Sequence, residues 1–482
     1  MEALRETWCV WAAGRWDGRV ASGAETELTG RLLAPRWVMQ MLFGTFDGHS
    51  GWHTSRLLST QLASYVASEL DLVFRGAAPY AGLSPDPIPT AASYSRGFWP
   101  FTSPRKLTAE PSGLDAHDPI IQAALKNAFA KLDGEIVQAP VRLLEQRGTR
   151  AAARPKGAMG AEENEALNTL LPALSGSCAL LAFLDAGRDK LHVAVTGDSR
   201  AVMGTWEPGP DGGRWRAEAL SADQTGKSAA EVARIRALHP ASEAETVIAR
   251  GRVLGSLEPS RAFGDARYKW PVGTQEKLAE AFHPGGMRGR PRNYLTPPYV
   301  TAEPEVVTVD LHEGVALPSA AASSPAGRLS TLATFLPGPS SASPAPPQAT
   351  RFLVLATDGL YDRLNNDEIV ALVGAHLSGL RGTHARAKIL KRVSASASRA
   401  GPAEPAHAPR QEPTRGEGDA FSFEDGNLST HLIRNALGGA KREQVSVLLS
   451  IPSPLSRRYR DDVSLAPFFF FAGKEILREW VC

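Results

Sequence analysis

The sequence contains very little cysteine. Three cysteines occur among 482 residues, Cys9, Cys178 and Cys482, and no two of them lie close together in the chain. Closely spaced cysteine pairs are typical of structural zinc sites, and a dense even-numbered set is typical of disulfide-stapled secreted domains. The sequence therefore predicts neither arrangement and favours a reducing compartment.

A large excess of one charge and long apolar runs are missing as well. The formal net charge is +2, so we expect no nucleic-acid partner. No apolar run approaches the roughly 18 residues of a membrane-spanning helix, so we expect no membrane span. The first residues include Glu2 and Glu6 and lack an apolar core, which predicts neither a secretory signal nor a typical transit peptide.

Proline, glycine, alanine and small polar residues concentrate in four stretches of the chain. Segments of this composition bury too little apolar surface to order themselves, so we interpret them as loop insertions. They lie near 75–115, 145–166, 315–350 and 392–426. The resulting division is an atypical N-terminal segment, 1–36, followed by a single domain, 37–482.

Between the insertions, strand and helix patterns alternate. An apolar run bounded by turn residues at 37–47 predicts a buried strand, and 52–70 has the apolar periodicity of a helix. Residues 177–204 indicate three strands joined by tight turns, which is typical of a β-meander. A later helix is predicted to have its N-cap at Asn366 or Asp367. The mixture predicts an α+β fold with antiparallel sheet.

Aspartate ends four of the predicted strands, at Asp47, Asp198, Asp358 and Asp461. Strand ends converge in a sheet core, and Mg²⁺ and Mn²⁺ prefer carboxylate and carbonyl oxygens. Gly48 has no side chain, which would let its carbonyl approach a metal closely. The pattern therefore predicts a metal site, although Asp-Gly pairs also form ordinary hairpin turns.

His49 follows the first of these aspartates directly. A histidine at the start of a helix is commonly just solvated. Beside a metal site it is a candidate proton donor, because its unperturbed pKa lies near neutrality.

The motifs taken together resemble those of one family. They include "FGTFDGHSGW", "SGSCALLAFL", "LHVAVTGDSRAVMG", "RVLGSLEPSRAFGDARYKWP", "RFLVLATDGLYD" and "YRDDVSL". In this order they resemble the metal-dependent Ser/Thr protein phosphatases of type 2C. The stretches "TPPYVTAEPEV" and "THLIRNALGG" are most similar to the pyruvate dehydrogenase phosphatases within that family.

The resemblance implies an antiparallel β-sandwich flanked by helix pairs, with two Mg²⁺ or Mn²⁺ ions per active site and a weaker third. It implies hydrolysis of phosphoserine or phosphothreonine by a metal-activated water, on pyruvate dehydrogenase or a similar phosphoprotein in the mitochondrial matrix. A cytoplasmic location is the alternative, and a regulatory subunit is not indicated either way. The implied metal ligands are Asp47, Gly48, Asp358 and Asp461, with Asp198 at the third ion. His49 is similar to the family's general acid.

The sequence departs from the family in its N-terminal part. The family has an arginine and an acidic pair upstream of the Asp-Gly-His motif, whereas the acidic and basic residues here stand in a different context. The residues in range are Arg15, Asp17, Arg19, Glu25 and Glu27. A catalytically impaired pseudophosphatase that acts as a binding module is therefore the alternative function. A different metallohydrolase is disfavoured, because His-rich metal spacing is missing.

Overall fold

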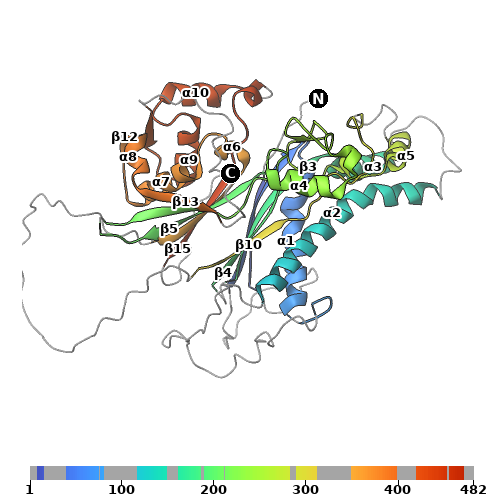
Figure 1. Ribbon diagram of the computed structural model, residues 1–482, viewed down its shortest axis with the longest axis horizontal. Coiled ribbons are helices and arrows are strands. Elements are labelled where there is room, and N and C mark those ends of the chain that lie inside the picture. The colour runs from blue at the N-terminus through green and yellow to red at the C-terminus, as the bar shows by residue number, and fades with distance from the viewer. Residues whose placement is uncertain are drawn as a thin grey trace, which may run out of the picture.

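Two β-sheets form the centre of the protein, with helices along the outer side of each (Figure 1). The structure is a computed structural model of the 482-residue chain. Its described residues are 8–15, 39–74, 76–80, 117–148, 161–185, 189–210, 212–282, 289–311, 349–398, 419–452 and 455–471.

The first sheet consists of antiparallel strands. They are β1 (Trp8–Arg15), β2 (Met39–His49), β3 (Gly176–Asp185), β4 (Lys190–Thr196), β9 (Phe263–Gly264) and β10 (Glu305–Asp310). The spatial order is β1-β2-β3-β4-β10, and the short β9 pairs with the beginning of β3. The strand predicted at 37–47 is thus confirmed as the second strand of this sheet. It continues through Asp47 and Gly48 to His49, so the alternative of a hairpin turn at Asp47 is wrong.

The second sheet faces the first. Its strands are β5 (Arg200–Glu207), β6 (Arg214–Ala219), β11 (Ala349–Ala356), β13 (Val393–Ser398) and β15 (Leu465–Phe471). The order is β13-β6-β5-β11-β15, with all pairs antiparallel except β13 with β6. Met41, Phe43, Leu353 and Phe468 are among the buried side chains of the core shared by strands of both sheets. Phe43 and Phe468 have ring centroids 4.1 Å apart.

The predicted meander is only partly correct. β3 and β4 form an antiparallel hairpin, but β5 does not continue it. The chain crosses after β4 into the second sheet, where β5 pairs with β6 and β11. Alternating patterns identify strands but not the sheet that each strand joins.

Helices α1 (His53–Phe74), α2 (Asp118–Gly148) and α3 (Ala161–Leu174) cover the first sheet. Figure 1 shows α1 and α2 lying lengthwise beside it. The apolar helical face predicted near 52–70 is confirmed, since Leu58, Leu62, Val66 and Leu70 are buried there.

The helices beside the second sheet lie on the opposite side of the molecule. They are α6 (Asp358–Tyr361), α7 (Asn366–Leu377), α8 (Arg386–Leu390), α9 (Leu428–Leu437), α10 (Arg442–Ser450) and the 3₁₀ turn η3 (Leu455–Arg458). A two-stranded sheet lies among them, formed by β12 (Gly382–Ala385) and β14 (Ala420–Phe423). The N-cap of α7 is Asn365, one residue before the predicted position, because its side chain and that of Glu368 form a reciprocal capping box.

A smaller group of helices and short strands lies between β6 and β10 in the chain, and we call its described residues, 225–282 and 289–301, the flap. It contains η1 (Ala241–Glu243), η2 (Ala266–Tyr268), α4 (Ala229–Leu238), α5 (Val272–Phe282), β7 (Ile248–Ala249) and β8 (Arg252–Val253), besides β9. Ile235, Val253 and Tyr299 belong to its own buried cluster.

The insertion predicted at 392–426 is partly wrong, because β13 and β14 lie within it. Val393 pairs with Trp215 of β6, so tertiary pairing orders residues whose composition alone would not. Most of the other three stretches lies outside the described residues. None of the described helices is both long and apolar enough to cross a membrane.

Candidate active site

Both sheets meet at one end of the sandwich. β2 ends at His49, which pairs with Gly176 at the start of β3, and β4 ends at Thr196 on the same side. From there residues 197–199 lead directly into β5 of the second sheet. β5 begins opposite the end of β11, at the pair Arg200 and Ala356. The strand ends named in the sequence analysis therefore lie at a common edge.

Asp47 and Asp198 flank a buried thiol at this edge. Cys178 lies opposite Asp47 in the strand register and donates a hydrogen bond from Sγ to Asp198 Oδ1 at 3.1 Å. Burial raises the pKa of the Cys178 thiol well above its usual value, and the Asp198 and Asp47 carboxylates raise it further. Two carboxylates, that of Asp47 near the end of β2 and that of Asp198 just after β4, thus lie near the neutral Cys178 thiol.

Asp358 and Asp461 come from neighbouring segments of the second sheet. Asp358 begins α6 immediately after β11, whereas Asp461 lies shortly before β15. The two segments are tied together, since Thr357 N–H donates to Ser464 O at 3.0 Å and Thr357 Oγ1 donates to Asp462 O at 3.1 Å. The structure thus brings these two predicted ligands to the same strand pair.

His49 is paired with an aspartate from a distant part of the chain. His49 Nε2 lies 2.5 Å from Asp265 Oδ2, and both side chains are buried. Gly176 makes the space for them, because a Cβ at that position would overlap both atoms. The alternative of a solvated histidine at a helix start is wrong, since His49 is buried at the end of β2 and α1 begins at His53.

Sequence reasoning missed Asp265 as a direct partner. The "SRAFGD" stretch stood out only as part of the family resemblance, and the sequence gives no sign that its aspartate reaches His49. Asp265 lies 216 positions away from His49. The pairing depends on β9 joining β3, which no local pattern predicts.

A buried arginine fixes the crossing between the sheets. Arg200 donates to both carboxylate oxygens of Asp223, at 2.9 and 2.6 Å, and to Asn366 Oδ1 at 3.0 Å. Its guanidinium carbon lies 4.4 Å from the ring centroid of Tyr361. These bonds link Arg200, which directly follows Asp198 and Ser199, to Asn366 at the start of α7. They therefore restrict movement of the chain where it crosses between the two sheets.

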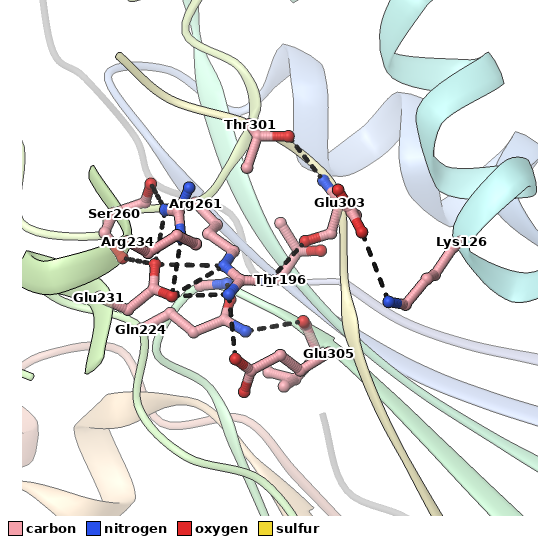
Figure 2. Close-up of polar contacts among 12 residues, drawn as sticks. Lys126, Thr196, Gln224, Glu231, Arg234, Ser260, Arg261, Thr301, Glu303 and Glu305 are labelled. Atoms are coloured by element: carbon pink, nitrogen blue, oxygen red, sulfur yellow. Dashed lines mark hydrogen bonds and ion pairs between the residues drawn. The ribbon is translucent and has the colours of Figure 1, made fainter. Parts of the chain in front are cut away.

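A second arginine joins the flap to the first sheet (Figure 2). Glu231 of α4 accepts bonds from Arg261 Nη2 at 2.6 Å, Arg234 Nη2 at 2.7 Å and Ser260 Oγ at 2.5 Å. Burial alone would raise the pKa of Glu231, but the bonds and charges of Arg234 and Arg261 outweigh it and lower the pKa to about 2. We call Glu231, Arg234, Ser260 and Arg261 the clasp.

The clasp also reaches strand β10. Arg261 Nη1 donates to Glu303 O and Nη2 to Glu305 Oε1, both at 3.0 Å. Glu303 in turn pairs with Lys126 of α2 at 3.4 Å (Figure 2). The flap is therefore anchored to the first sheet and, through a more exposed contact, to α2.

The donor set at this edge has the chemistry of a hard divalent cation site. It offers the carboxylates named above and the backbone carbonyl of Gly48, and oxygen atoms of these kinds are the ligands that Mg²⁺ and Mn²⁺ prefer. Within the described ranges, no three His, Cys, Asp or Glu side chains are grouped so as to hold an ion. The N-terminal candidates do not alter this, because 16–38 and the side chain of Arg15 lie outside the described residues.

Comparison with known proteins places the chain in a family. The profile of the family "Protein phosphatase 2C" matches residues 119–316. The mitochondrial [pyruvate dehydrogenase [acetyl-transferring]]-phosphatase 1 of Saccharomyces cerevisiae is 34% identical over 89% of this chain and 61% of its own length. A protein phosphatase 2C homolog of Schizosaccharomyces pombe is 33% identical over 89% of this chain and 73% of its own length. The human phosphatase 1 of the same name is 32% identical over 88% and 71%.

This chain belongs to the protein phosphatase 2C family, a metal-dependent family. Among solved structures, a Toxoplasma gondii serine-threonine phosphatase 2C matches with a TM-score of 0.33 and 17% identity, over 73% of this chain and 77% of that chain. The two described sheets and their flanking helices confirm the predicted α+β class. The chain spans 61% of the length of its yeast relative.

Proposed function

We propose that this protein is a metal-dependent protein serine/threonine phosphatase that acts on a pyruvate dehydrogenase subunit or a similar mitochondrial phosphoprotein. The observation that supports the activity is that the segments carrying Asp47, Asp198, Asp358 and Asp461 end or begin at one edge of the two sheets, the edge at which β2 ends in His49. The substrate and the mitochondrial location are supported by the names of the yeast and human relatives alone.

The carboxylates of Asp47, Asp358 and Asp461 and the carbonyl of Gly48 would hold two Mg²⁺ or Mn²⁺ ions, with Asp198 at a weaker third. When bound, such ions supply positive charge that lowers the pKa of a water and neutralises phosphoryl oxygens. The net reaction breaks the bond between phosphorus and the serine oxygen and forms one between phosphorus and a water oxygen.

His49 is the proposed proton donor to the departing serine oxygen. A serine alkoxide is a poor leaving group, so a proton delivered as the bond breaks speeds the reaction, typically by about 10²–10⁴-fold. No covalent enzyme intermediate is required. Cys178 is buried and its pKa is raised, which makes it a poor nucleophile.

Phosphate release from a phosphoserine peptide tests the proposal. We expect turnover with Mn²⁺ or Mg²⁺, none with EDTA, and a loss of at least about 100-fold in Asp47→Asn and Asp358→Asn. Asp310→Asn is the matched control, because Asp310 pairs with Lys190 at the opposite end of the first sheet. No turnover from folded protein with either metal would refute the proposal and favour the pseudophosphatase alternative.

A further inference from the structure

Asp265 reaches His49 from a tightly held segment. Its own N–H donates to Ser175 O at 2.9 Å, one residue before the start of β3. The preceding N–H, of Gly264, donates to Asp133 Oδ1 of α2 at 2.9 Å. Lys269 Nζ also forms an ion pair with Asp133 Oδ2, at 2.7 Å, so residues on both sides of Asp265 are bound to the same carboxylate. The carboxylate is thus fixed by both the first sheet and α2.

The backbone of Asp265 is strained. Its φ and ψ are 45° and 37°, in the left-handed region that non-glycine residues seldom adopt. Such backbone strain in a non-glycine residue persists only where surrounding contacts enforce it.

The clasp fixes the other end of the same segment. Arg261 lies four residues before Asp265, and its guanidinium is locked between Glu231 of the flap and residues 303–305 (Figure 2). Next to it, Ala262 N–H donates to Thr301 O at 2.9 Å. Residues 261–265 are therefore held at both ends. Arg261 is bound in the clasp, and the N–H groups of Gly264 and Asp265 donate to Asp133 and Ser175.

We propose that Asp265 is the positioning residue of His49, and that the clasp anchors the segment that presents Asp265. This inference rests on the phosphatase function proposed above. Asp265 accepts the hydrogen bond from His49 Nε2 and so fixes the plane of the imidazole ring.

Leaving groups of different basicity test the positioning role. Asp265→Asn should lower kcat on a phosphoserine peptide by about 10–100-fold, because a misoriented ring loses part of the general-acid effect. On 4-nitrophenyl phosphate, whose leaving group needs little protonation, the loss should stay below about 3-fold. KM for the peptide should remain unchanged. Asp310→Asn, at the far end of the sheet, should alter neither rate.

A double-mutant cycle separates positioning from general destabilisation. In a His49→Gln background, Asp265→Asn should cause no further loss on the peptide, since its effect passes through His49. Gly176→Ala inserts a methyl group between the two side chains and should give the same leaving-group signature as Asp265→Asn.

Variants of Arg261 test the anchor. Arg261→Lys keeps the charge but loses the fork, and should lower kcat on the peptide by about 3–10-fold, more than on the aryl phosphate. Glu305 forms only a partly exposed ion pair with Arg261, so Glu305→Gln should have no such effect.

The outcomes are distinct. If wild-type protein releases no phosphate from either substrate, the proposed function fails. If wild-type protein is active but Asp265→Asn and Gly176→Ala lower both rates equally, or neither rate, the positioning role is refuted. Should Asp265→Asn not fold, the Gly176→Ala and Arg261→Lys comparisons decide the same question, and both retain Asp265.

Discussion

Replacing Glu231 by glutamine removes the negative charge at the centre of the clasp while keeping the side chain's size. Glu231 is 3% exposed and Arg261 6% exposed, so the variant leaves a buried guanidinium with one partly exposed carboxylate, Glu305, as its ionic partner. Breaking a buried pair on one side typically costs about 3–5 kcal/mol. We expect a clear loss of stability.

The pKa of Glu231 gives an independent magnitude. It falls from 4.5 to about 2 on folding, which corresponds to about 3 kcal/mol of stabilisation at neutral pH. Because the folded pKa is depressed, this stabilisation is present above pH 4.5 and is lost as the pH falls toward 2. Glu231→Gln has no such group, so the difference between the two proteins should shrink in acid.

Urea unfolding at pH 7 and at pH 3.5 measures both effects. We expect Glu231→Gln to lower the free energy of unfolding by about 3 kcal/mol at pH 7, with the gap narrowing by about 1 kcal/mol at pH 3.5. Glu305→Gln is the control and should cost less than about 1 kcal/mol, because the Glu305 side chain is 42% exposed. A Glu231→Gln effect as small as that of the control, or one insensitive to pH, would refute the reasoning.

Three further predictions concern the second sheet and its helices. Burial and the neighbouring His376 lower the pKa of His431 to about 3, so acid should destabilise the protein as the pH falls from 6.5 toward 3; His431→Gln should reduce that slope in pH-dependent unfolding. Gly204→Ala should cost about 1–3 kcal/mol in urea unfolding, because the new methyl group would overlap the buried ring of Phe352; an unchanged midpoint would contradict this. Asn365→Ala removes the N-cap of α7 and should lower stability by about 1 kcal/mol in the same assay, whereas Asn365→Asp should be nearly neutral.

Much of the fold follows from local patterns. The strand that ends in Asp47 and His49 and the helix with Leu58 and Leu62 on its buried face were both predictable, because each depends on a short apolar period. The family motifs supplied the sandwich arrangement. The division of the chain at residue 36 stays a prediction, although β1 of the N-terminal segment pairs with β2 of the predicted domain.

The missed features depend on long-range pairing. The crossing from β4 to β5, the parallel pairing of β13 with β6, and the contact between His49 and Asp265 join residues that no local period relates. Even the N-cap at Asn365 was misplaced by one residue, because neighbouring Asn and Asp residues offer the same capping chemistry. The roles of Asp47, Asp358 and Asp461 at a metal remain predictions for the mutants to test.

The crossing at residues 197–199 has a consequence for how the site comes into being. The proposed ligands run from Asp47 in β2 to Asp461 just before β15, so every strand between them must be in place first. Such distant pairings form slowly, and a chain on the ribosome that has not yet reached Asp461 lacks one of the proposed ligands. Hydrolytic activity would therefore arise only after Asp461 has been synthesised and the strands around it have paired.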